Sequence, residues 1–365
     1  MKPIRYFYTC LAVVLCLFSQ KSEAVTYVTD TGGYAYDESR AATNLAPAIA
    51  LGTVVVVAII AIAVQNSHHS SHSHWLFMDA IPSHPLVVSD RPFLHPRLLA
   101  LSSLLAEYSF ANLYLFRATH HYRLVEGEGF PVIGYSRKGG PFLLPTSLQP
   151  EDMFATKQLA KQHRLPLFPI SEEWLPLFSP FSDKTKDPDD NDYLFSHQTL
   201  STYPGRKLDK KRNLVSQFLR YKNTTLLPME ENTQFYALEV LKNWQSHVKE
   251  PPHLSDFFPC QEALSLLNIL ELRGSIVFVE GKPAGFFLGE WNTPNCFTIH
   301  FCKGDIAYKG IYPYLFQKAA KAAMSMAGEC WINLEQDLGK PTLRKAKMAY
   351  HPDQLLSKYL VWVDF

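Results

Sequence analysis

The chain lacks the cysteine pattern of a disulfide-rich fold or of a structural zinc site. Its six cysteines are scattered, and no two of them are separated by two residues. Cysteine-based zinc sites usually contain such closely spaced pairs. Three of the four cysteines after residue 250 lie within apolar runs. We therefore expect no metal, and we expect buried free thiols in a reducing compartment.

The chain also lacks a net charge that would indicate a partner. Lys and Arg number 35 and Asp and Glu number 34, so the formal net charge is only +1. Any site for nucleic acid or another polyanion must therefore rest on a local cluster. Hydrophobic residues make up 47% of the sequence, including 24 Phe and 18 Tyr. A chain of 365 residues with this composition can bury a large core and suits about two domains.

Two apolar segments near the N-terminus indicate a membrane anchor. Residues 1–24 have the basic start, apolar run and small-residue end of a signal peptide or signal anchor. Residues 46–64 carry no charge and can form a transmembrane helix across a hydrocarbon core of about 30 Å, although a buried element of a globular core is the alternative. We expect a membrane protein whose residues 75–365 face the cytoplasm.

Residues 65–74 form a His/Ser-rich segment between this anchor and the rest of the chain. Its four His residues raise the alternative of a metal site, but no carboxylate or Cys lies beside them. A flexible linker is therefore the preferred interpretation.

The remaining sequence alternates helical and strand-like patterns and predicts an α+β fold of two lobes. The first lobe spans residues 75–195 and begins with a helix over 97–116, broken near Ser109. A charged connector, SDKTKDPDDNDY, ends this lobe at residues 182–193. The second lobe spans residues 196–365 and contains the main cleft.

The second lobe shows a recognisable order of elements. Helices are followed by a three-strand meander over 275–302, a helix over 311–327, a strand over 329–335, a short helix and a final strand. This order is the layout of the GNAT acyltransferase fold, whose mixed sheet splays beside its fourth strand to receive an acyl donor. The helix after that strand would offer its N-terminus to an anionic phosphate.

Several motifs along residues 85–365 occur together in one order. They are EYSFANLYLFR, DPDDNDYLFS, GRKLDKKRN, IHFCKGDIAYKGIY, INLEQDLGKPTLRKAKMAYHP and KYLV. In this combination the chain resembles the C-terminal domain of phosphatidylglycerol lysyltransferases and its stand-alone relatives. The resemblance implies two GNAT-like lobes in tandem. It also implies transfer of an aminoacyl group, typically lysyl, from a tRNA to a lipid hydroxyl.

The expected function is therefore a membrane-anchored aminoacyltransferase that uses aminoacyl-tRNA as co-substrate and needs no other cofactor. Its acceptor would be a lipid or another hydroxyl or amine. Two alternatives remain open. One is an acyl-CoA-dependent acyltransferase, although only Gly310 remains of the phosphate-binding loop that acetyl-CoA users share. The other is a catalytically inactive GNAT-like binding protein at a membrane.

Three residues are candidates for the chemistry. Glu335 and Asp337 follow the strand over 329–335, whose end opens on the cleft in this fold. They are expected to bind a cationic aminoacyl group or to orient the acceptor, and helix capping is the alternative. His351 is a candidate proton shuttle, with a structural role in a turn as the alternative.

The stretch YPGRKLDKKRN is the first candidate anion-binding cluster. Arg206, Lys210, Lys211 and Arg212 recur there at roughly helical spacing. We expect them to contact phosphate at an edge of the cleft where the two lobes meet. A solvated helix face is the alternative.

Further phosphate contacts are expected at two other places. Lys309 and Gly310 precede the helix over 311–327, and Arg344 and Lys347 lie three residues apart on one face of a short helix. These groups would meet a tRNA end or a lipid headgroup. Glu290 and His300, on adjacent meander strands, are either buried polar residues or a base that faces the cleft.

Overall fold

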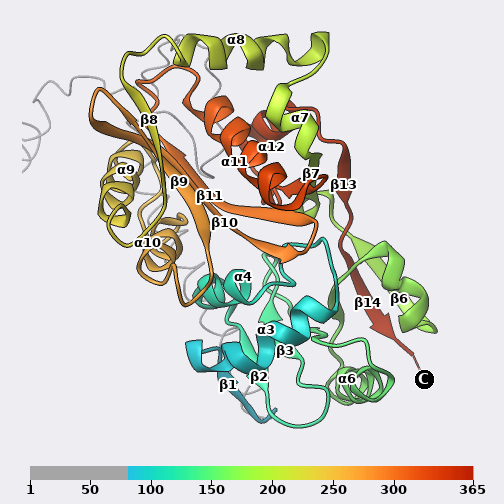
Figure 1. Cartoon of the computed structure of the whole chain (residues 1–365). Coiled ribbons are helices and arrows are strands. Elements are labelled where there is room, and N and C mark those ends of the chain that lie inside the picture. The colour runs from blue at the N-terminus through green and yellow to red at the C-terminus, as the bar shows by residue number, and fades with distance from the viewer. Residues whose placement is uncertain (1–80, 365) are drawn as a thin grey trace, which may run out of the picture.

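The computed structural model describes residues 81–364, which form an α+β fold built on two mixed seven-stranded sheets (Figure 1). The predicted α+β class with mixed sheets is confirmed. The predicted segments 1–24, 46–64 and 65–74 lie outside the described residues. Between residues 81 and 364, no helix has the length and apolar character needed to cross a bilayer.

Each sheet contains one parallel pair of strands, formed by its fourth and fifth members, and all its other neighbours are antiparallel. In spatial order the first sheet consists of β1 (Ser83–Pro85), β2 (Arg123–Val125), β3 (Val132–Tyr135), β4 (Pro141–Leu144), β5 (Leu167–Ile170), β14 (Tyr359–Val363) and β6 (Phe181–Lys186). The second consists of β8 (Thr224–Pro228), β9 (Arg273–Val279), β10 (Lys282–Thr293), β11 (Cys296–Gly304), β12 (Trp331–Asn333), β7 (Asp192–Ser196) and β13 (Gln354–Leu356).

The two sheets exchange their sixth strands. β14 enters the first sheet between β5 and β6, and β7 enters the second sheet between β12 and β13. This corrects the predicted lobe boundary after residue 195, because β7 belongs to the second sheet and the final strand belongs to the first. The physical reason is backbone pairing: without β14, β5 and β6 would lose the partner that they share.

Helices cover the faces of both sheets. Those of the first lobe are α3 (Arg91–Ala100), α4 (Phe110–Leu115), α5 (Arg117–His120) and α6 (Pro150–His163). Those of the second are α7 (His197–Thr202), α8 (Asp209–Phe218), α9 (Gln234–Ser246), α10 (Phe257–Ser265), α11 (Ile311–Ala327) and α12 (Pro341–Met348). The predicted break near Ser109 is confirmed, because Ser109 caps α4 by accepting a hydrogen bond from the Asn112 N–H.

The charged connector does not form the solvated loop that its composition suggests. It contains β6, a 3-10 turn and the start of β7. Asp187 pairs with Lys138 at 2.7 Å, and Asp189 pairs with Arg344 at 2.5 Å. Cations from other elements therefore neutralise these acids and allow an ordered path.

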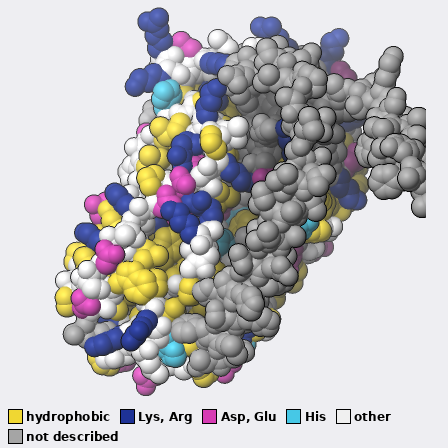
Figure 2. Space-filling model, turned by 180° about the vertical axis from the view of Figure 1, so that it is seen from behind, with side chains coloured by type: hydrophobic (Ala, Val, Ile, Leu, Met, Phe, Trp, Pro, Cys, Tyr) yellow, Lys and Arg dark blue, Asp and Glu magenta, His cyan; other side chains and the backbone are white. Residues whose placement is uncertain are grey.

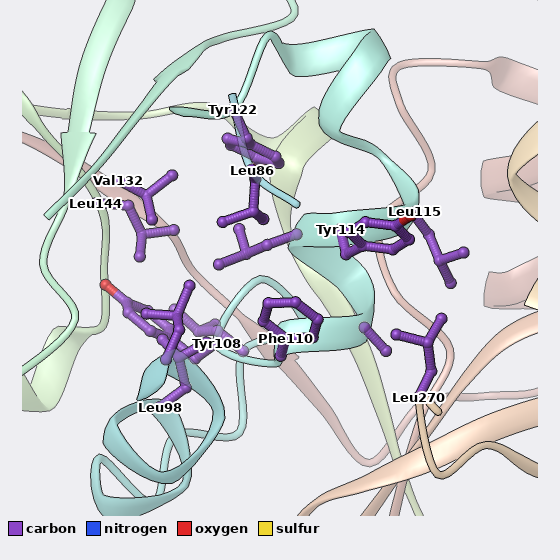
Figure 3. Close-up of a cluster of buried hydrophobic side chains, with 14 of the residues drawn as sticks. Leu86, Leu98, Tyr108, Phe110, Tyr114, Leu115, Tyr122, Val132, Leu144 and Leu270 are labelled. Carbon is purple, nitrogen blue, oxygen red and sulfur yellow. The ribbon is translucent and has the colours of Figure 1, made fainter. Parts of the chain in front are cut away.

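Alternating side chains divide the core of the second sheet. Phe286, Leu288 and Phe301 join the hydrophobic cluster that also fills the first lobe, whereas Phe287 and Ile299 join a second cluster beneath α11. Figure 3 shows the shared cluster, in which Leu270 lies near Leu115 of α4. Burying such a side chain contributes about 1.5–3 kcal/mol, so the lobes stabilise each other.

The cysteines of the described residues follow their prediction. All four are buried free thiols: Cys260, Cys296, Cys302 and Cys330.

Candidate functional site

The second sheet splays between β11 and β12. The two strands pair only where Cys296–Thr298 lies beside Trp331–Asn333. Beyond this contact β11 continues to Gly304, whereas β12 ends. The gap that the GNAT-like layout predicts is therefore present.

A β-bulge places His300 at this gap. In the pairing of β10 with β11, Gly289 lies opposite Ile299 and Leu288 opposite Phe301, so His300 is the extra residue. A bulge re-aims a side chain that strict alternation would place elsewhere. The His300 side chain is fully buried, with Nε2 2.9 Å from Glu290 Oε1 and Nδ1 2.7 Å from Glu335 Oε1.

The two carboxylates decide the protonation state of His300. Burial alone lowers the pKa of an imidazole, but the hydrogen bonds and negative charges of Glu290 and Glu335 outweigh it and raise the pKa to about 10. The ring is therefore an imidazolium at neutral pH and donates to both carboxylates. It acts as a fixed positive charge rather than as a base, and the three groups together carry a net charge of −1.

Glu335 is the member of this trio that reaches solvent. Its side chain is 14% exposed, compared with 5% for Glu290 and 0% for His300. Its backbone has the left-handed φ of +58°, which costs a non-glycine residue free energy and often marks a functional site. The Asn333 side chain holds this conformation by accepting the Glu335 N–H at 2.6 Å.

The first lobe completes the site. Ser109 donates to Glu290 Oε1 at 2.5 Å, and Asn112 donates through Nδ2 to Glu335 Oε1 at 3.0 Å. Nearby, the Leu104 carbonyl accepts a hydrogen bond from Asn333. The trio is therefore held from both lobes.

The other two predicted catalytic residues lie elsewhere. Asp337 is completely buried, where it accepts hydrogen bonds from the Tyr193 hydroxyl, the Gly339 N–H and Arg344. Burial opposes its ionisation, but these bonds outweigh it and lower the pKa of the carboxyl. Asp337 thus fixes the loop before α12, and His351 is exposed beyond the end of that helix, with its N–H bonded to the Met348 carbonyl.

Arg344 and Lys347 are bonded to other groups of the protein, although the Arg344 side chain is 41% exposed. Arg344 pairs with Asp337 and Asp189. Lys347 is 2% exposed, and its Nζ donates to the carbonyls of Leu334, Glu335 and Gln336. Burial lowers the pKa of Lys347 to about 8. Lys347 is therefore too buried to contact phosphate as expected, whereas Arg344 is half-exposed and already paired with two carboxylates.

The YPGRKLDKKRN cluster divides into half-buried and exposed residues. Arg212 donates to the carbonyls of Tyr203 and Gly205, and Lys211 lies 3.7 Å from the centre of the Tyr350 ring. Arg206 and Lys210, by contrast, are exposed.

The position of this cluster also differs from the prediction. Figure 1 shows α8 at the opposite end of the molecule from α3 and α6, so the cluster does not lie where the lobes meet. The reason is packing. α8 packs against α11 within the second lobe, whereas α4 and α10 contact each other between the lobes. The rear view in Figure 2 shows Lys and Arg side chains projecting at this upper end.

The N-terminus of α11 does not form the expected phosphate cradle. A side chain at Gly310 would collide with the Leu214 carbonyl, because the backbone of α8 packs directly against it. The Ile311 N–H is bonded to the Tyr308 carbonyl, and Pro313 has no N–H to offer. Lys309 is exposed beside this closed end.

A buried charge network was not predicted. Lys358 is completely buried, with Nζ 2.7 Å from Glu107 Oε1 and 2.6 Å from Asp192 Oδ1. Burial raises the pKa of Glu107 to about 7, although the Lys358 charge opposes that rise. These residues occur within the motifs noted in the sequence, but periodicity gives no signal that a charged residue will be buried. Across residues 81–364, no cluster of His, Cys, Asp and Glu is arranged to hold a metal ion.

The comparison with protein families decides the ancestry of the chain. The family described as phosphatidylglycerol lysyltransferase, C-terminal, matches residues 100–362. The chain belongs to this family. No curated protein matches the chain significantly.

Solved structures of relatives share the fold. A conserved protein of unknown function from Bacteroides thetaiotaomicron aligns with a TM-score of 0.68 at 21% identity, covering 78% of this chain and all of that one. L-PGS from Bacillus licheniformis aligns with a TM-score of 0.55 at 16% identity, covering 78% and 93%. The C-terminal domain of a putative lysylphosphatidylglycerol synthetase from Agrobacterium fabrum gives 0.50 at 16% identity, covering 76% and 92%. At these identities the likeness extends to the fold alone.

Proposed function

We propose that this member of the lysyltransferase family transfers an aminoacyl group from aminoacyl-tRNA to a hydroxyl or amine acceptor at a membrane. The observation that carries the proposal is His300, bulged out of β11 at the splayed strands and held between Glu290 and Glu335. The trio's net charge of −1 complements the ammonium group of an aminoacyl ester. Glu335 would bind that ammonium, since its side chain reaches solvent.

The chemistry requires little beyond this positioning. The acceptor oxygen or nitrogen bonds to the ester carbonyl carbon, the bond to the tRNA ribose oxygen breaks, and the acceptor proton passes to the departing ribose oxygen. Because the ester is already activated, holding the two reactants together supplies most of the acceleration. The ion pairs of His300 keep Glu335 in place during the transfer.

The N-termini of α11 and α6 both disfavour acyl-CoA as the donor. A coenzyme A pyrophosphate is best held by unsatisfied N–H groups at a helix start. In the second lobe, α8 and Pro313 close the start of α11. In the first lobe, the corresponding helix α6 begins with Glu151 and Asp152, which repel an anion.

The exposed basic residues support a tRNA contact. Arg206, Lys210 and Lys309 lie on the surface around α8 and the loop before α11. They would contact the phosphates of a tRNA, whereas a lipid headgroup would serve as the acceptor. Residues 46–64 would anchor the chain in the membrane and keep residues 75–365 on the cytoplasmic side.

The test uses the full chain in detergent micelles with phospholipid. One reaction contains tRNA charged with radiolabelled lysine, and a parallel one contains labelled acetyl-CoA. We expect label transfer from the tRNA only, and we expect Glu335→Gln to abolish it. Glu329→Gln is the matched control, because Glu329 is an exposed carboxylate near the other end of β12. Transfer that survives unchanged in Glu335→Gln would refute the assigned centre.

One observation favours a second candidate, a binding protein without catalysis. His300 is completely enclosed, and Ser109 and Asn112 occupy the gap beside it. In that case the same experiment would show tRNA retained by the protein with no transfer of label, whatever acceptor is added.

A further inference from the structure

A cavity of about 580 Å³ lies in the second lobe between the C-terminal half of α11 and strands β8 to β11. Its inner wall is apolar and includes Phe287, Trp291 and Phe297 from the sheet and Ala319 and Ala323 from α11. Its volume is within the range of about 300–1,000 Å³ that is typical of ligand sites.

The cavity exists because small side chains face the sheet. α11 presents alanines at the place where it passes over β10 and β11. Met326, near the C-terminal end of α11, also lines the cavity, and it is 60% exposed. Methionine adapts its shape to flexible apolar ligands.

The polar residues that line the cavity come from two segments of the chain. They lie in the loop after β8 and at the turn into β9, and they include Glu230, Glu231, Asn268 and Arg273. The cavity thus has a charged side and an apolar wall, which is the pattern that an amphiphile requires. Its apolar wall suits a hydrocarbon chain better than a polar metabolite, because each buried CH₂ contributes about 0.8 kcal/mol.

The cavity is separate from the site at the splayed strands. Trp291 and Phe297 point toward the α11 side, where both contact the second hydrophobic cluster. Glu290 and His300 instead meet Ser109 and Glu335 at the contact with the first lobe. A ligand in the cavity would therefore lie across the sheet from the proposed transfer centre.

We propose that this cavity binds the hydrocarbon chain of a single-chain amphiphile such as a fatty acid or a lysophospholipid. Trp291 lies in the cavity wall and serves as the reporter. The proposal goes beyond the transfer reaction and does not depend on it.

The experiment measures quenching of tryptophan fluorescence in the full chain by dibromostearate and by a brominated lysophosphatidylcholine, both below their micelle concentrations. We expect saturable quenching that disappears in Trp291→Phe, which removes the reporter. Ala322→Phe, which adds a ring at the exposed rim, should weaken binding at least about tenfold. Ser325→Phe places the same ring on an exposed position of α11 outside the cavity lining and should bind as the wild type does.

The two probes distinguish the source of the chain. Stronger binding of dibromostearate indicates a free fatty acid, and stronger binding of the lysolipid indicates a membrane lipid; either result supports the proposal. Quenching that does not saturate, or that is equal in Trp291→Phe and wild type, overturns it. Circular dichroism and the unfolding temperature of each variant verify that a loss of binding is not a loss of fold, and Trp291→Phe keeps the test valid if a ring at 322 is not tolerated.

Discussion

Lys358→Met tests the buried charge network most directly. The Lys358 ammonium lies 2.6–2.7 Å from oxygen atoms of Asp192, Glu107 and Gln336, and no part of the lysine is exposed. Methionine keeps the length of the side chain but removes the cation. Two carboxylates then share a buried site without a counter-charge.

The structure sets the size of the effect. Removing one partner of a buried ion pair costs about 3–5 kcal/mol, because an uncompensated charge remains. Glu107 limits the loss by binding a proton, since its pKa of about 7 rises further once the Lys358 charge is gone. We therefore expect a loss of about 3 kcal/mol near pH 7.5, at the lower end of that range.

The measurement is urea unfolding of the full chain at pH 7.5 and at pH 5.5. Folded Glu107 retains its proton up to about pH 7, whereas the unfolded carboxyl loses it near pH 4.5. The difference between variant and wild type should therefore shrink as the pH falls. Lys321→Met, at an exposed position of α11, should change stability by less than about 0.5 kcal/mol. A loss below about 1 kcal/mol at pH 7.5, or an equal loss at both pH values, would refute the reasoning.

Three further predictions concern the site, the basic surface and the strand exchange. The ring of His300 should titrate near pH 10 by NMR, so its stabilising effect is complete below about pH 6.5 and is lost as the pH rises through 10; a midpoint near 6.5 would contradict the ion pairs. Arg206→Ala with Lys210→Ala should reduce the salt slope of tRNA binding by about two, while Arg212→Ala should instead lower the unfolding midpoint, and the reverse pattern would show that Arg212 is the contact. Deleting residues 359–363 should yield protein that aggregates on expression, and a soluble, cooperatively unfolding product would show that β5 and β6 do not need their shared partner.

Local patterns predicted the elements well. The meander over 275–302 alternates apolar residues between two faces, and the structure places three strands there. The predicted helix over 97–116 is two helices in the structure, and its predicted break near Ser109 coincides with the serine cap of α4, which needs only neighbouring residues to form.

Local patterns could not predict which distant segments pair with each other. The sequence of the final strand predicts extended backbone, but it does not indicate whether the strand pairs in the first sheet or in the second. Lys358, just before that strand, reads as a surface residue by type, and only its meeting with Glu107 and Asp192 makes burial tolerable. The exchange and the network that stabilises it had to be observed.

The candidate site could be predicted only in part, because local patterns locate a residue on a strand but not the residues that it will contact. Glu335 lies at the end of a predicted strand, and the fold brings it to the gap as expected. His300 was noted, but its direction depends on a bulge that alternation cannot show. Asp337 and Arg344 each looked available until they were found to pair with each other.

The strand exchange has a consequence for synthesis on the ribosome. The first sheet has its fifth strand complete at residue 170, yet the strand that must lie beside it begins only at residue 359. Until β14 is synthesised, β5 and β6 lack the strand that pairs with both of them. β7 likewise waits for β12 and β13, which follow it in the sequence. The first sheet therefore cannot complete its pairing until the second lobe has been synthesised, and unpaired strand edges of this kind are prone to aggregation during that interval.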